Sequence, residues 1–262
     1  MIRNRIALCA LFLSAACCFL PRAARAQAFA SSILQFSNVT ITPDSGTVQF
    51  LGPPWTANAF AQAQNSLGGS DSNSASSLGG AANASAAVTY ASANGNANAA
   101  TLAGTGISTV NITVPFVQAS SVGRGSLTNS FVVNGGTGTV NVTFDVDISG
   151  TLGVFTGVFG EMADTETIFS WDLVGPGIPT PILFRQDFLH IDGPNQTAST
   201  SFTTHLSTVI ALDFGTTYEA TITADSESLG ITSVPEVSPA FACLIGMVVM
   251  AGLLRRSIRV RA

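Results

Sequence analysis

Residues 139–149 read Thr-Val-Asn-Val-Thr-Phe-Asp-Val-Asp-Ile-Ser, and their alternation decides the fold class. Successive side chains of a β-strand point to opposite faces, so a period of two predicts a strand with one buried face and one wet face. The side chains predicted to face a core are Val140, Val142, Phe144, Val146 and Ile148. The side chains predicted to face water are Asn141, Thr143, Asp145, Asp147 and Ser149.

Further short runs of β-like sequence flank this strand. Strands are predicted at 131–133, 168–174, 182–191, 202–212 and 218–224. Glycine-containing turns separate them at 135–136, 175–177 and 215. The turn at 135–136 joins two such runs directly, which is typical of a β-hairpin. Short strands with glycine and proline turns, and no convincing helix, predict an all-β body, an antiparallel β-sandwich over residues 107–232.

The sequence before residue 107 has two different compositions. Residues 27–56 contain short β-like runs at 33–36, 39–41 and 48–51. Residues 57–106 are dominated by Ala, Asn, Ser and Gly, and Asp71 is their one charged side chain. Such a low-complexity segment is flexible in one interpretation. In the other, which stays open, its small residues alternate with polar ones and form thin, flat strands.

Charged residues are sparse and unevenly placed. Lys is absent, and eight of the ten Arg residues lie at the two ends, which leaves Arg124 and Arg185 between them. Fourteen of the fifteen acidic residues lie in that same central part, so the body is strongly acidic and nucleic acid is excluded as a partner. The cysteines are also terminal, so residues 27–232 contain no disulfide, thiolate catalyst or Cys-based metal site.

The N-terminus has the three parts of a cleavable signal peptide over residues 1–26. Arg3 and Arg5 supply a positive start, and residues 6–20 are apolar except for one serine. Ala24 and Ala26 then provide small residues at the positions that signal peptidase requires, which predicts cleavage before Gln27. The alternative is an uncleaved anchor helix, for which this apolar run is short.

Residues 233–262 form a tail of three parts. The short motif Val234-Pro235-Glu236 comes first, an uncharged run of fifteen residues at 240–254 follows, and an arginine cluster ends the chain. The cluster consists of Arg255, Arg256, Arg259 and Arg261. It stays cytoplasmic under the positive-inside rule, which leaves the body outside. At about 22 Å, a helix of this length falls short of a hydrocarbon core of about 30 Å, which favours transient insertion. A permanent tail anchor is the alternative.

This tripartite tail resembles the PEP-CTERM sorting signal, and the resemblance covers residues 234–262. It implies that an exosortase-type enzyme recognises the motif and processes the chain near it. The usual motif is Val-Pro-Glu-Pro; here Val237 replaces the second proline, and Pro239 follows two residues later. Residues 208–228 also loosely resemble the β-sandwich bodies that precede such tails, and those bodies share no common activity.

The two histidines are the first candidates for chemistry. His190 and His205 lie fifteen residues apart on separate predicted strands. A catalytic or metal-binding role would need a third group brought close by the fold. No hydrolase, nucleotide-binding or zinc-protease motif occurs in the body. Surface histidines near a strand edge are the plain interpretation.

Carboxylates are the second candidates. Asp145 and Asp147 share one strand face, so they either hold a Ca²⁺ ion with further oxygens or form a solvated face. A second acidic group could supply the carboxylate pair of a glycosidase, or could simply be a charged turn. Its members are Glu161, Asp164, Glu166 and Asp172. Trp55 and Trp171 could stack on sugars or pack in the core.

No catalytic, metal or cofactor-binding residue follows from these patterns, and no cofactor is expected. We expect an exported, non-enzymatic surface or extracellular-matrix protein, sorted by its tail and associated with exopolysaccharide. The expected partners are signal peptidase and an exosortase-type enzyme, with transient insertion in the inner membrane. A secreted carbohydrate- or calcium-binding module is the alternative, and a secreted hydrolase is a weaker third.

Overall fold

The structure is a computed structural model, and it describes residues 26–158, 160–178 and 180–233. These residues form twelve strands in two six-stranded sheets. The first sheet, sheet A, has the spatial order β11 (Gln196–Asp213), β8 (Thr139–Thr156), β1 (Ala28–Pro43), β6 (Ala103–Ile112), β5 (Ala91–Asn98), β4 (Ala81–Val88). The second, sheet B, has the order β10 (Leu183–Asp192), β9 (Met162–Val174), β12 (Thr217–Ile231), β7 (Gln118–Asn134), β2 (Thr47–Asn65), β3 (Ser70–Leu78).

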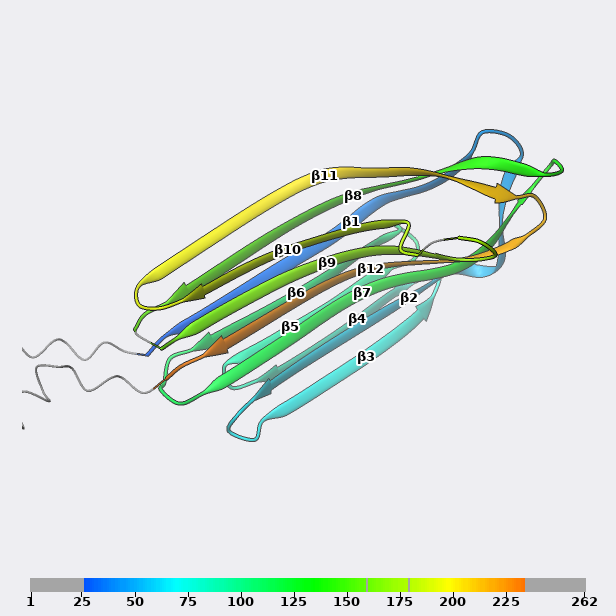
Figure 1. The fold of residues 1–262 in the computed structure, drawn as a ribbon. Helices are drawn as coiled ribbons and strands as arrows, with labels where there is room; N and C mark the ends of the chain where they lie inside the picture. The colour runs from blue at the N-terminus through cyan, green and yellow to red at the C-terminus, as the bar shows by residue number, and fades with distance from the viewer. Residues whose placement is uncertain (1–25, 159, 179, 234–262) are drawn as a thin grey trace, which may run out of the picture.

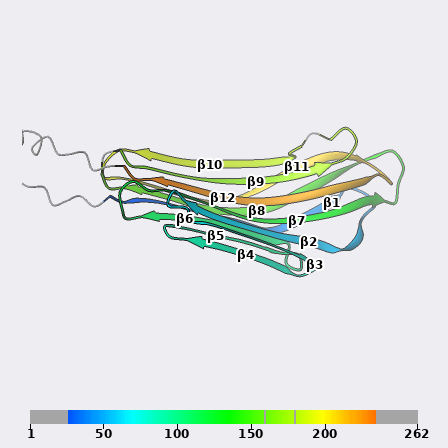
Figure 2. The same cartoon turned by 90° about the horizontal axis from the view of Figure 1, so that it is seen from below.

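The strands run along one long axis and every pairing between neighbours is antiparallel (Figure 1 and Figure 2). The predicted all-β class and sandwich-like architecture are therefore confirmed for the described residues. β1 begins and β12 ends at the same end of the sandwich (Figure 1). The proposed leader and tail thus join the body at one end.

The predicted hairpin at Gly135-Gly136 is wrong. This turn joins β7 of sheet B to β8 of sheet A, so the two strands do not pair. β7 is already paired with β12 on one side and with β2 on the other, which leaves no edge for β8. The turn near Gly215 also crosses between sheets, from β11 to β12. In contrast, β9 and β10 do form a hairpin around Gly175-Pro176-Gly177.

The large side chains of the core lie in the half of the sandwich that contains β8, β9 and β12. The predicted inward set of β8, from Val140 to Ile148, is buried, and Val142 has no exposed surface. Phe144 meets Trp171 edge to face with ring centroids 5.4 Å apart, and Phe131 packs against Tyr218 at 5.9 Å. Such aromatic pairs bury large areas, so this cluster is the main hydrophobic core.

The other half of the sandwich is thin, and it contains the segment from residue 57 to 106. This segment forms β3, β4 and β5 with parts of β2 and β6, so the alternating-strand interpretation is the one that the structure shows. The inward side chains of β2, β4 and β5 are largely alanines. Ala61 and Ala97 have no exposed surface. The segment is therefore part of both sheets, with buried alanines on its inner side, and the alternative of a flexible segment is wrong.

Glycines let the main chains of the two sheets touch in this thin half. A Cβ atom added at Gly125 of β7 would overlap the carbonyl oxygen of Asn96 in β5. One added at Gly123 would overlap the carbonyl oxygens of Asn94 and Ile107. The sheets therefore approach more closely here than the about 10 Å usual for sheets packed through larger side chains. Close packing of backbone replaces the missing apolar side chains.

Candidate polar site on the outer face of sheet A

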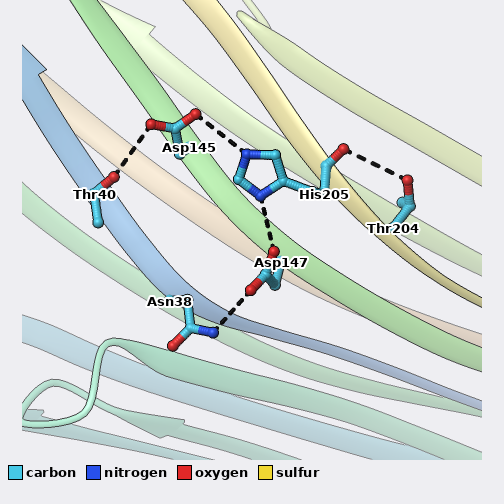
Figure 3. A network of polar contacts seen from close by, with 6 residues as sticks. All are labelled: Asn38, Thr40, Asp145, Asp147, Thr204 and His205. Carbon is cyan, nitrogen blue, oxygen red and sulfur yellow. Dashed lines mark hydrogen bonds and ion pairs between the residues drawn. The ribbon is translucent and has the colours of Figure 1, made fainter.

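A cluster of ionisable side chains lies on the outer face of sheet A, where β1, β8 and β11 run side by side (Figure 3). His205 of β11 is directly opposite Asp147 of β8 in the strand register. The His205 Nδ1 atom lies 2.8 Å from Asp147 Oδ1, and its Nε2 atom lies 3.4 Å from Asp145 Oδ1. Figure 3 shows the imidazole between the two carboxylates. The predicted sharing of a face by Asp145 and Asp147 is thus confirmed, and His205 is the group that they share.

A β-bulge in β1 completes the cluster. The register between β1 and β8 shifts between Ser37 and Thr40, and Asn38 adopts a φ of 54°. Asparagine tolerates this left-handed conformation better than most residues. The bulge turns the Asn38 side chain outward, where its Nδ2 atom donates to Asp147 Oδ2 at 2.8 Å. Thr40 beyond the bulge donates to Asp145 Oδ2 at 3.4 Å. Both carboxylates are therefore held from two sides.

These contacts favour the charged forms of the two central groups. The hydrogen bond from Asn38, followed by that from His205, lowers the pKa of Asp147 below 3.8. The hydrogen bond to Asp147 is the main cause that raises the pKa of His205 above 6.5, and Asp145 raises it further. The His205 side chain is 58% exposed, so solvent weakens the attraction. The cluster is therefore a surface ion pair of His205 with two aspartates, and Asn38 and Thr40 each donate a hydrogen bond to one carboxylate.

Rows of uncharged polar side chains cross sheet A beside this cluster. In the strand register, the row next to the Asp147–His205 pair runs through Asn83, Asn96, Thr105, Gln35, Ser149 and Thr203. Every member carries a hydroxyl or an amide, and the row spans all six strands. Neighbouring strands are about 4.8 Å apart, so the row presents hydrogen-bonding groups at a regular spacing.

A shallow depression of about 410 Å³ lies over the part of this row on β1, β8 and β11. Its lining combines the polar side chains Gln35, Ser149, Thr151, Ser201 and Thr203 with the apolar side chain of Ile33. Gly150 also lines it, and on the inner side of the sheet a Cβ at Gly150 would overlap the Phe202 ring. Polar groups around a small apolar surface suit a ligand that has both hydroxyls and C–H faces. Sequence reasoning missed this depression, because only the pairing of three strands creates it.

The second histidine lies on the outer face of sheet B, at the edge strand β10. His190 is opposite Asp164 and forms an ion-pair contact with it, and Phe188 stacks on its ring at 6.2 Å. Both histidines thus lie on edge strands, as the plain interpretation predicts. His190 and His205 are held in separate carboxylate contacts on different sheets, so they form no common site.

The acidic group from Glu161 to Asp172 is divided between a buried turn and the outer face of β9. Glu161 is buried in the turn after β8, whereas Asp164, Glu166 and Asp172 point outward from β9. Asp172 accepts from Ser170 and Thr180, and Glu166 accepts from Gln186. The structure instead places Glu227 of β12 opposite Glu166, a pairing that the sequence did not reveal.

Two carboxylates of β12 on this surface, Asp225 and Glu227, have a raised pKa. Partial desolvation raises the pKa of Glu227 first, and the charges of Asp225 and Glu166 raise it further. An open depression of about 340 Å³ is lined there by Glu166, Glu227 and Phe188 among others. Two carboxylates on neighbouring strands repel each other, and Gln186 neutralises none of that charge. This surface therefore places two like charges opposite each other on neighbouring strands.

The remaining residues singled out in the sequence are the two tryptophans and the terminal motifs. Trp55 is 5% exposed and Trp171 is fully buried, so both pack in the core, which confirms the second of their two interpretations. Ala26 is buried and the main-chain nitrogen of Gln27 donates to Glu161. Ala24, the motif Val234-Pro235-Glu236 and the arginine cluster lie outside the described residues.

Two further observations limit the candidate sites. Within residues 26–158, 160–178 and 180–233, no group of three or more His, Cys, Asp or Glu side chains is arranged to hold a metal ion. Over the same part of the chain, the structure contains no helix with the length and apolar character needed to cross a membrane. Comparison with protein-family models, curated proteins and solved structures found no match.

Proposed function

We propose that this chain is an exported, non-enzymatic surface or extracellular-matrix protein that associates with exopolysaccharide. Export is supported by the signal-peptide pattern of residues 1–26, and sorting is supported by the PEP-CTERM-like tail of residues 233–262. In this proposal signal peptidase removes the first segment and an exosortase-type enzyme acts on the second. The mature protein then lies at the cell surface or in the matrix.

The single observation that supports polysaccharide association is the polar row across sheet A. Six hydroxyl and amide side chains cross the sheet in one line, and no carboxylate interrupts them. A glycan presents hydroxyls that both donate and accept, so uncharged partners of this kind suit it at little desolvation cost. Ile33 in the adjacent depression offers an apolar patch for the C–H face of a sugar ring.

The distribution of acidic side chains over the two sheets agrees with a polysaccharide contact on sheet A. Carboxylates gather on sheet B, where Asp164, Glu166 and Glu227 lie close together. The polar row itself is uncharged, so it does not repel a neutral or anionic polymer, and His205 partly balances the nearby Asp145 and Asp147. The outer face of sheet A beside β1 is therefore the favoured contact surface. A secreted carbohydrate-binding module with the same face is the second candidate function.

Binding to polysaccharide from the producing cells tests the proposal. The variant Ser149→Ala with Thr203→Ala removes two adjacent hydroxyls from the row. Its matched control is Ser170→Ala with Thr223→Ala, an adjacent serine–threonine pair on the outer face of sheet B. Co-sedimentation with the purified polymer should weaken about tenfold for the first variant and stay unchanged for the control. Equal binding by both variants contradicts the proposed surface.

A glycan array separates the two candidate functions. A matrix protein is expected to bind an extended polymer through many weak contacts along the sheet, so isolated short oligosaccharides should bind poorly. A binding module is expected to hold a short oligosaccharide in the depression lined by Gln35 and Ser201. Strong, selective binding of one short glycan favours the module.

A further inference from the structure

Glu161 is a buried carboxylate without a cationic partner in the described part of the chain. The residue is 1% exposed, and it lies in the turn between β8 and β9. Its Oε2 atom accepts the main-chain N–H groups of Gly157 at 2.6 Å and Val158 at 2.8 Å. Its Oε1 atom accepts the main-chain N–H of Gln27 at 2.7 Å. These three hydrogen bonds offset part of the cost of burying the carboxylate, and an opposite charge would offset more of it.

The nitrogen that contacts Oε1 has a special position in the sequence. Gln27 is the residue that directly follows Ala24-Arg25-Ala26, the expected signal-peptidase site. Cleavage there breaks the Ala26–Gln27 peptide bond by hydrolysis and leaves a carboxylate on the released leader. The same nitrogen becomes an α-amino group, which is protonated near neutral pH. The change turns a neutral N–H donor into an ammonium ion without moving the atom.

We propose that Glu161 is the binding site for the α-ammonium group that cleavage before Gln27 creates. This inference rests on the export part of the proposed function. The leader's removal thus completes a buried ion pair at the start of β1. A charge-assisted hydrogen bond replaces a neutral one, which makes it stronger and gives the buried carboxylate its counter-charge.

Both sides of this contact are already fixed in position. The Gln27 carbonyl accepts from the Gly157 N–H at 2.9 Å, so the first residue of the mature chain is tied to the same turn as Glu161. The Glu161 carbonyl accepts from the Gly193 N–H at 3.2 Å. Through the ion pair and the hydrogen bond from Gly193, Glu161 therefore links the start of β1, the turn after β8 and the turn before β11. Since β1 lies inside sheet A, between β6 and β8, the link secures a central strand.

The burial of Ala26 sets the order of events. Ala26 is 4% exposed in the folded body, so a protease cannot reach the Ala26–Gln27 bond there. Cleavage must come before this end of the sandwich closes. Processing and folding are then coupled, because the folded body gains the ion pair only after the leader has gone.

The absence of lysine makes the proposal testable by amine chemistry. The sequence contains no Lys, so the α-amino group is the single primary amine of the mature chain. The protein is recovered from exporting cells as the Gln27→Ser variant, because an N-terminal glutamine can cyclise and the Gln27 side chain is exposed. A succinimidyl ester then acetylates the amine, and mass spectrometry of the N-terminal peptide gives the rate. The matched variant adds Glu161→Gln.

We expect the Glu161 protein to be acetylated at least about tenfold more slowly than the Glu161→Gln protein, because ion pairing raises the pKa of an amine and limits access to it. Full acetylation in denaturant followed by refolding supplies a second readout. An acetyl group has the size of the Ala26 carbonyl that the fold already holds, so it removes the charge without new bulk. The Tm should fall by about 4 °C in the Glu161 protein and by much less in the Glu161→Gln protein.

Three results overturn the proposal when both proteins fold. The first is equal acetylation of both proteins, and the second is an equal loss of Tm after acetylation. The third is an exported protein whose first residue is not residue 27, and this result leaves polysaccharide binding by sheet A unaffected. If the Glu161→Gln protein does not fold, the folded Glu161 protein is compared with the same protein in denaturant. Equal rates in that comparison also overturn the proposal.

Discussion

His205 and Asp147 lie on neighbouring strands, fifty-eight residues apart in sequence, with the imidazole Nδ1 atom 2.8 Å from the carboxylate. The pair exists because β11 runs antiparallel to β8 along its whole length and places the two residues opposite each other. Asn38 in the β1 bulge approaches the same carboxylate from the other side. The contacts of this cluster therefore depend on the alignment of β1, β8 and β11 in sheet A.

The pH dependence of stability should reveal this cluster. Because the folded pKa of His205 is raised above 6.5, its contribution is full below that pH and is lost as the pH rises through the folded value. The pKa of Asp147 is lowered, so its contribution is lost only as the pH falls through its own folded value, below 3.8. The native protein should therefore have a higher Tm than His205→Gln at about pH 5.5, and this advantage should vanish at about pH 9. A constant difference at both pH values contradicts the pairing.

Calcium is expected to change stability little. The imidazole of His205 lies between Asp145 and Asp147, where a metal ion would have to bind. A ligand that binds only the folded state raises the Tm. We expect millimolar Ca²⁺ to leave the Tm of the native protein unchanged. A clear rise that disappears in the variant Asp145→Asn with Asp147→Asn would show that the cluster is a calcium site.

The two faces of β8 should respond differently to a charge. Val142 is fully buried, so Val142→Asp brings an unpaired carboxylate into the core and should cost at least about 4 kcal/mol. Thr143 faces outward, and Thr143→Asp should change the free energy of unfolding by only about 0.5 kcal/mol. Urea unfolding of both variants measures the difference. Equal destabilisation would mean that the faces are assigned wrongly.

The close approach of the sheets in the thin half gives a fourth prediction. Gly125→Ala places a methyl group against the main chain of β5 and should destabilise the protein by at least about 2 kcal/mol. Gly153→Ala is the matched control, because a Cβ there meets no atom within 4 Å. That control should be neutral or slightly stabilising, since alanine restricts the unfolded chain more than glycine does. If both variants lose the same stability, the sheets are further apart than the structure shows.

The local pattern of the sequence predicted the strands and their faces well. Strict alternation from Val140 to Ile148 predicted the buried side of β8, and the strand predicted at 218–224 lies within β12. This works because the period of a strand is a property of the local chain. Residues 57–106 left two alternatives open, because alanine gives little hydrophobic signal even when it is buried.

Pairing between distant strands could not be predicted in this way. The glycines at 135–136 are typical of a hairpin, yet β7 has two other partners and the turn crosses to the second sheet. The contact of His205 with Asp147 and the opposition of Glu166 and Glu227 depend on the same long-range choices. The outward side of Asp145 and Asp147 was predictable, whereas their shared histidine was not.

Sorting through the tail is tested most directly by fractionation of cells with and without the exosortase-type enzyme. An antibody to the body reports the size and the compartment of the protein. We expect a shorter protein at the surface or in the matrix when the enzyme is present, and a full-length tail in the inner membrane when it is absent. Replacing Pro235 and Glu236 with alanine should have the same effect as loss of the enzyme. The same size and the same compartment in both strains would contradict the proposed sorting.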